Sequence, residues 1–169
     1  MLKEIGDLEF KNKKQLYDFM KMRLTALIGE EEDWLANLSN ASALMWQLLK
    51  DINWSGFYLM KGDKLVLGPF QGKPACVNIE VGKGVCGTAA ATKELQLVKN
   101  VHDFPGHIAC DSASNSEIVL PIVVDGKVVG VLDIDSPKFE RFDEEDAVGL
   151  TKFVEVLVKY VDFEQALNR

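Results

Sequence analysis

The sequence predicts an α+β fold: a central antiparallel sheet with helices on one face and loops on the other. Two segments with apolar residues at helical spacing open the chain, short β-rich runs joined by turn residues follow, and an amphipathic segment closes it. Strands paired as hairpins describe an antiparallel sheet that helices can cover on one side. Residues 1–169 are expected to form one domain, since this length suffices for one substantial core and is short for two.

Each predicted helix carries a stripe of apolar residues. The first ends at Gly29, the second follows an acidic turn, and the last begins at the acidic run 143–146, where the helix dipole favours negative charge. Apolar side chains three or four residues apart share one face, which we expect to be buried. These positions are Leu16, Phe19, Met20, Leu24 and Leu27 in the first helix, Leu35, Leu38, Met45, Leu48 and Leu49 in the second, and Leu150, Phe153, Val154, Leu157 and Tyr160 in the last.

Two hairpins are expected to form the sheet. Residues 54–60 and 65–70 flank a Lys-Gly-Asp-Lys turn, and residues 117–124 and 127–135 flank an Asp-Gly pair. Turn residues of this kind between apolar runs are typical of β-hairpins.

Alternation along these strands assigns side chains to faces. Trp54 and Tyr58 share one face of the first strand, where they either line a cavity or pack in the core. Asp133 and Asp135 also share one face of their strand. Because burial of an unpaired carboxylate is expensive, these two aspartates are expected either to be exposed to solvent or to engage another group.

The segment that contains Cys86 begins with glycines and continues into an alanine run that favours helix. Cys86 is therefore expected at or near a helix start, where unpaired backbone N–H groups can lower a thiol pKa or hold a carboxylate or phosphate. The glycines lack the Gly-Lys-Ser/Thr ending of a nucleotide-binding loop, so nucleotide phosphate chemistry is not expected.

The acidic composition argues against a nucleic-acid partner. The formal net charge is −7 at pH 7, whereas binding to a phosphate backbone needs clustered lysine and arginine. No run approaches the roughly 18 apolar residues that span a bilayer, and the first residues lack the basic flank and apolar stretch of a signal peptide. We therefore expect a cytoplasmic protein that acts on neither nucleic acid nor membrane.

The three cysteines point to redox chemistry or to packing. In a reducing compartment they are not expected to form a structural disulfide framework, and their spacings of 10 and 24 residues match no Cys-x-x-Cys metal pair. Cys110 lies in a loop rich in glycine and serine, seven residues before Glu117, so a nucleophile and a proton donor are close along the chain. Inert packing remains the alternative, because reactivity depends on thiolate formation and access.

Four segments carry a family resemblance. Residues 132–146 resemble the common ending of GAF domains, and residues 67–76, 82–87 and 104–112 resemble the free methionine-(R)-sulfoxide reductases, which are stand-alone GAF proteins. The resemblance extends over nearly the whole chain. It implies a GAF fold and the reduction of free L-methionine-(R)-sulfoxide to methionine, with no metal or organic cofactor.

The resemblance also implies roles for the cysteines. Cys110 corresponds to the attacking cysteine and Cys76 to its recycling partner. Cys86 matches a family cysteine that lines the site and can also form disulfides, so the choice between Cys76 and Cys86 as resolving cysteine stays open. Thioredoxin is the reductant that the family implies.

Carboxylates and aromatic residues complete the implied site. Glu117, Asp133 and Asp135 correspond to the family's site carboxylates, and Trp54 to an aromatic residue near the substrate methyl group. Tyr58 is added because it shares a strand face with Trp54.

The reaction itself requires a thiol beside a carboxylic acid. A thiolate that attacks a sulfoxide sulfur displaces oxygen only when that oxygen is protonated, and Glu117 and Asp135 are the candidate acids. Clustered carboxylates raise one another's pKa, which keeps a proton available near neutral pH. The acidic cluster also suits the substrate ammonium, while N–H groups of the 82–87 turn or of the Cys110 loop are candidates for its carboxylate.

A GAF module that binds a cyclic nucleotide or another small ligand, or that forms a homodimer, is the alternative function. It would explain the fold and the aromatic strand face. It would not explain three cysteines that each lie in a segment marked by glycine or proline.

Overall fold

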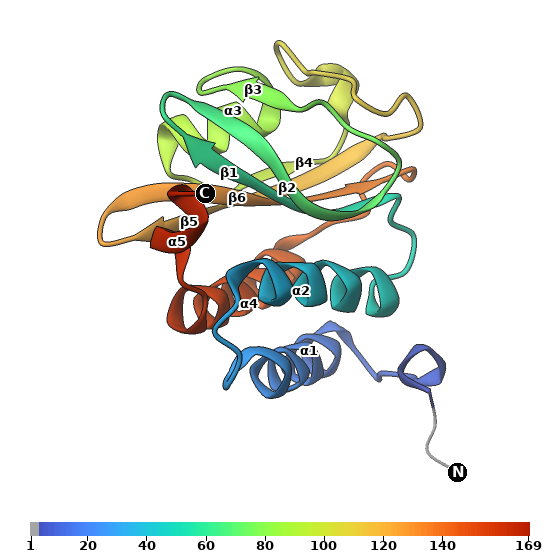
Figure 1. Ribbon diagram of the computed structural model, residues 1–169. Coiled ribbons are helices and arrows are strands. Elements are labelled where there is room, and N and C mark those ends of the chain that lie inside the picture. Colours follow the sequence, from blue (N-terminus) through green and yellow to red (C-terminus); the bar gives the residue numbers. More distant parts are fainter. Residues whose placement is uncertain (1–3) are drawn as a thin grey trace.

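A six-stranded antiparallel sheet separates two layers of unequal thickness in the computed structural model, which describes residues 4–169 (Figure 1). The strand order is β3-β2-β1-β6-β5-β4. The strands are β1 (Trp54–Lys61), β2 (Lys64–Gly72), β3 (Asn78–Glu80), β4 (Gln96–Val98), β5 (Ser116–Val124) and β6 (Lys127–Ser136). The helices are α1 (Lys13–Ile28), α2 (Trp34–Leu48), α3 (Gly84–Thr92), α4 (Glu144–Tyr160) and α5 (Phe163–Leu167), with short 3-10 turns η1 (Ile5–Asp7) and η2 (Val101–Asp103).

The helices at the two ends of the chain cover one face of the sheet. Helix α2 packs on β1 and β2, α4 packs on β5, and α1 lies outside both of them (Figure 1). Helix α3 and the loop after η2 lie on the opposite face. The predicted α+β fold and the two hairpins are confirmed. The short edge strands β3 and β4 and helix α5 add to this outline.

Most predicted apolar stripes are buried, with two exceptions in α1 and α2. Met20, Leu24 and Met45 are fully buried, whereas Leu27 is 37% and Leu35 is 51% exposed. The expectation that these two leucines are buried is wrong. Both lie in terminal turns beside the α1–α2 connection, where a helix has neighbours on fewer sides.

Helices α1 and α4 are held together by a buried polar contact. Asp146, which also completes a capping box with Asp143, accepts hydrogen bonds from the Tyr17 hydroxyl (2.7 Å) and the Lys13 ammonium (2.6 Å). One turn along α4, a Cβ on Gly149 would lie 2.1 Å from the Tyr17 ring. The absence of a side chain at Gly149 therefore allows the two helices to approach closely.

The sheet has a core on each face. Alternation along β1 sends Phe57 and Leu59 into the larger core beneath α2 and α4, and sends Trp54 and Tyr58 into a smaller one beneath α3. The smaller core borders the candidate site. Among residues 4–169, no helix combines the length and apolar character needed to cross a bilayer.

Candidate active site

Strand pairing brings three predicted site residues into one row. Trp54 on β1 lies opposite Asp135 on β6, and Asp135 lies opposite Glu117 on β5. Asp133, two residues earlier on β6, lies in the next row on the same face. The three central strands therefore place three carboxyl groups and an indole ring beneath the loops that cover this face.

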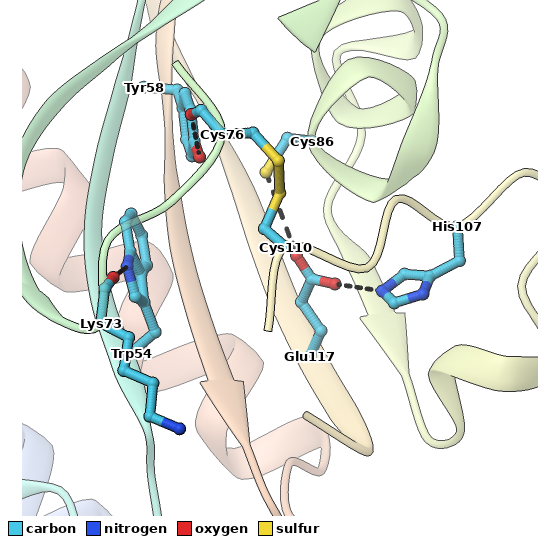
Figure 2. Close-up of a disulfide and its surroundings, with 8 residues drawn as sticks. All are labelled: Trp54, Tyr58, Lys73, Cys76, Cys86, His107, Cys110 and Glu117. Carbon is cyan, nitrogen blue, oxygen red and sulfur yellow. Dashed lines mark hydrogen bonds and ion pairs between the residues drawn. A yellow bond between two sulfur atoms is a disulfide. The ribbon is translucent and has the colours of Figure 1, made fainter. Parts of the chain in front are cut away.

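A disulfide joins two of these covering loops (Figure 2). Cys76 and Cys110 are 34 residues apart in sequence, and their Cα atoms are 5.8 Å apart. The Tyr58 hydroxyl donates to the Cys76 carbonyl (2.9 Å), and the Trp54 indole donates to the Lys73 carbonyl (3.2 Å). The two aromatic residues of β1 thus hold the Cys76 loop over the sheet.

Cys86 is buried in the first turn of α3 and lies outside the disulfide. Its Sγ lies 4.0 Å from Glu117 Oε1. Burial raises the pKa of the Cys86 thiol well above its ordinary value, and the nearby charges of Asp133, Glu117 and Asp135 raise it further. Of the two possible effects of a helix start, a lowered thiol pKa or a bound anion, the first does not occur at Cys86, because burial and the nearby carboxylates raise the pKa. Cys86 is therefore a neutral thiol at pH 7.

The three carboxyl groups lie close together on a largely buried part of the sheet face. Glu117 and Asp133 are 6% and 5% exposed, and Asp135 is partly buried. Burial raises the pKa of Glu117 well above its usual value, and the charges of Asp133 and Asp135 act in the same direction. Burial also raises the pKa of Asp135 and of Asp133, although hydrogen bonds with Glu117 and Cys86 oppose the rise at Asp133. The cluster can therefore keep a proton near neutral pH.

One oxygen of this cluster has no partner. Asp133 Oδ1 is buried and accepts no hydrogen bond from the described residues. Ligand atoms of Asp133, Glu117 and Cys86 lie within 4.8 Å of one another, so these three are the residues that could hold a metal ion. A buried oxygen without a donor marks a place for a cationic or hydrogen-donating ligand.

Sequence reasoning did not single out His107 as a site residue. Its Nε2 lies 3.8 Å from Glu117 Oε2, and its side chain is 15% exposed (Figure 2). Burial lowers the pKa of His107, and the nearby His102 lowers it further, so the contact joins two neutral groups at pH 7. The position of His107 three residues before Cys110 is the one signal that could have indicated it.

These groups line a single pocket that contains about 560 Å³ of space, part of it open to solvent. All the predicted site residues except Cys76 line it, and Cys76 is bonded to one that does. Lys73, Lys83 and Gly84 also contribute. Lys83 is the N-cap of α3, and no side chain accepts a hydrogen bond from the first-turn N–H groups there. The pocket therefore combines an acidic floor with an uncapped helix start.

The comparisons with known proteins agree on one family. A family model described as GAF domain matches residues 39–157. The free methionine-R-sulfoxide reductase of Escherichia coli strain K12 is 56% identical over 148 residues, which cover 88% of this chain and 90% of that protein.

Two solved structures extend the similarity to the fold. The Staphylococcus aureus protein abbreviated fRMsr, solved in complex with substrate, is 51% identical with a TM-score of 0.82, and the match covers 85% of this chain and 94% of that one. The free methionine-R-sulfoxide reductase of Neisseria meningitidis, in complex with its substrate, is 40% identical with a TM-score of 0.89, and the match covers 94% and 96% of the two chains. The chain belongs to the free methionine-R-sulfoxide reductase family of GAF-domain proteins.

Proposed function

We propose that this protein reduces free L-methionine-(R)-sulfoxide to L-methionine, with Cys110 as nucleophile and thioredoxin as the final reductant. The observation that carries the proposal is the Cys76–Cys110 disulfide above three carboxyl groups in one pocket, two of them buried and one partly buried. A nucleophile needs only a nearby acid to reduce a sulfoxide, and both are present. The identity of the substrate is inferred from the family to which the chain belongs.

The first half of the reaction reduces the substrate sulfur and oxidises Cys110. The Cys110 thiolate forms a bond to the sulfoxide sulfur while the carboxyl groups of Glu117 and Asp135 deliver two protons to the oxygen, which leaves as water. Water then cleaves this sulfur–sulfur bond, methionine departs, and Cys110 is left as a sulfenic acid. The substrate sulfur gains the two electrons that Cys110 loses.

The second half restores the thiols. The Cys76 thiolate attacks the Cys110 sulfenic acid, water is released, and the disulfide forms. Cys76 and Cys110 are both partly exposed, whereas Cys86 is buried. This difference favours Cys76 as the resolving cysteine and leaves the disulfide accessible to a dithiol such as that of reduced thioredoxin, which returns both cysteines to thiols by exchange.

The acid is assigned to Glu117, with Asp135 beside it. Glu117 is the more deeply buried of the two, and Asp133 and Asp135 both act to keep it protonated. Asp135 lies directly opposite Glu117 in the sheet. It can return a proton to Glu117 or donate a second proton to the sulfoxide oxygen.

Recognition of both ends of a free amino acid explains the choice of substrate. The unpaired Asp133 Oδ1 suits the ammonium, and the uncapped start of α3 at Lys83 suits the carboxylate. Trp54, which stacks on Tyr58 with ring centroids 5.8 Å apart, supplies an apolar wall for the methyl group. A methionine sulfoxide inside a peptide has neither charge and would have to thread its chain through the pocket.

The direct test incubates the protein with racemic free methionine sulfoxide and dithiothreitol and follows the two sulfoxide epimers by chiral chromatography. Selective loss of the R form with matching appearance of methionine is expected. Tight binding of a small ligand without any turnover would contradict the proposal and favour a GAF binding module instead.

A further inference from the structure

Cys86 is a buried thiol that the proposed reaction does not use directly. The sequence has three cysteines, and the other two form the disulfide. The Cys86 thiol, the Glu117 carboxyl group and the Asp133 carboxyl group each offer an atom to one small volume, with all three atoms within 4.8 Å of one another. All three residues are buried. We call this set the Cys86 cluster.

The spacing of the Cys86 cluster is close to that of a tetrahedral metal site. Zinc bonds of about 2.3 Å to sulfur and about 2.0 Å to oxygen, at a tetrahedral angle, put the two ligand atoms about 3.5 Å apart. Cys86 Sγ lies 4.0 Å from Glu117 Oε1. This pair is therefore about 0.5 Å wider than a zinc site requires, so the side chains would have to move closer together to bind the ion.

A second observation points to a cation at this place. Asp133 Oδ1 is buried in the pocket without a hydrogen-bond donor, and among the described residues no lysine or arginine forms an ion pair with Glu117 or Asp133. His107 Nε2 lies 3.8 Å from the other oxygen of Glu117 and is not one of the three ligand atoms that lie within 4.8 Å of one another. The set therefore lacks positive charge and presents sulfur and oxygen together.

We propose that the Cys86 cluster binds one Zn²⁺ ion and that the bound ion blocks the pocket. Thiolate sulfur together with carboxylate oxygen suits zinc, whereas magnesium and calcium prefer oxygen ligands alone. The ion exchanges with the protons of the ligand groups, and no group is oxidised or reduced. It occupies the carboxylates assigned to the acid and to the substrate ammonium, so it acts as an inhibitor and not as a cofactor.

Cobalt binding to the oxidised protein tests the ion site without any activity measurement. With Cys76 and Cys110 in the disulfide, only Cys86 can supply sulfur, so a sulfur-to-cobalt charge-transfer band reports this thiol alone. We expect one equivalent of Co²⁺ to produce the band and one equivalent of Zn²⁺ to remove it. Absence of the band in the oxidised protein overturns the proposal.

Three variants assign the ligands. Cys86→Ser is expected to abolish the charge-transfer band. Asp133→Asn is expected to weaken Zn²⁺ binding by roughly tenfold or more, since even the loss of a group that only supports a ligand costs this much. Asp111→Asn is the matched control, because Asp111 lines the same pocket outside the Cys86 cluster. Equal weakening by Asp111→Asn and Asp133→Asn, or a band that survives Cys86→Ser, refutes the assignment. The Asp133 result stands even if Cys86→Ser fails to fold.

Inhibition is measured separately and rests on the proposed function. Reduced, desalted enzyme is mixed with methionine sulfoxide for a single turnover, in the absence of added thiols that would bind the metal. Zn²⁺ is expected to slow methionine formation at concentrations that fill the site, and more substrate is expected to relieve the effect. Full activity with the site filled refutes the inhibitory role, and no turnover without Zn²⁺ refutes the proposed function.

Discussion

Acetylation of the substrate nitrogen tests whether the pocket recognises the ammonium group of a free amino acid. N-acetylmethionine sulfoxide keeps the sulfoxide, the side chain and the carboxylate, but its nitrogen carries no charge. If Asp133 Oδ1 receives the substrate ammonium, acetylation removes this contact and leaves the oxygen as it is in the unliganded protein, buried without a donor. The chemistry at sulfur is unchanged, so any loss in kcat/KM belongs to recognition.

The size of the loss follows from the burial of Asp133. A hydrogen bond to a charged group contributes about 1.5–3 kcal/mol, and a buried polar group left unsatisfied costs about 1–3 kcal/mol. Asp133 is 5% exposed, so solvent compensates little when the ammonium is absent. The two figures describe overlapping effects and are not added; a loss of roughly 2–4 kcal/mol corresponds to about 30- to 1000-fold in kcat/KM, since about 1.4 kcal/mol is a factor of ten. A peptide-bound substrate is expected to be poorer still.

The assay compares kcat/KM for free, acetylated and peptide-bound L-methionine-(R)-sulfoxide with dithiothreitol as reductant. Asp133→Ala is expected to bring the free and acetylated values closer together, because the variant has no carboxylate to pair with the ammonium. Asp111→Asn, at a pocket carboxylate that already accepts a hydrogen bond from the Ala113 N–H, is expected to preserve the ratio. Equal efficiency on all three substrates would refute recognition of the charged amino end.

Further substitutions test the remaining roles. Cys110→Ser is expected to abolish reduction even with dithiothreitol, whereas Cys76→Ser should retain one stoichiometric turnover in a quench assay and lose thioredoxin-driven recycling. Glu117→Gln and Asp135→Asn should each slow single-turnover methionine formation by about a hundredfold if their carboxyl groups assist departure of oxygen. Burial raises the pKa of Glu117 above the unfolded value near 4.5, so the stability that the protonated carboxyl group contributes at low pH is lost as the pH rises toward the folded pKa. Urea titrations should therefore show that the free energy of unfolding of Glu117→Gln rises relative to that of wild type between pH 4 and pH 8. Gly149→Ala should lower the free energy of unfolding by about 1–3 kcal/mol, despite alanine's better helix propensity, since the new methyl group meets the tyrosine ring on α1.

The faces of the central strands could be predicted, but their register could not. A two-residue turn after Val124 pairs residues whose numbers sum to 251, which would put Glu117 opposite Ile134 and away from the aspartates. A bulge between Ile122 and Val123 shifts the pairing by one residue, so Glu117 lies opposite Asp135. A slip of one residue exchanges the two faces of a strand. The presence of this bulge is a tertiary property that the alternating pattern does not reveal.

The state of Cys86 is a second property that local sequence cannot give. A helix start alone can favour the thiolate or hold an anion. Glu117 and Asp133, which raise the pKa of Cys86 together with burial, lie 31 and 47 residues further along the chain. Their effect appears only when the sheet brings β5 and β6 beneath α3. The position of His107 depends in the same way on how its loop folds back over Glu117.

Two buried aspartates differ in whether the protein supplies their hydrogen-bond donors. Asp146 is 1% exposed and receives the Lys13 ammonium and the Tyr17 hydroxyl, so its charge and its hydrogen bonds are satisfied within the protein. Asp133 is 5% exposed and retains an oxygen without a donor, beside Glu117 in a space with no lysine or arginine partner among the described residues. Folding gains nothing from that arrangement, because an unpaired buried polar group destabilises the native state. We therefore expect the site to be complete only when a ligand brings the missing donor, and the proposed ammonium group or metal ion would then gain binding energy from the stability lost at Asp133.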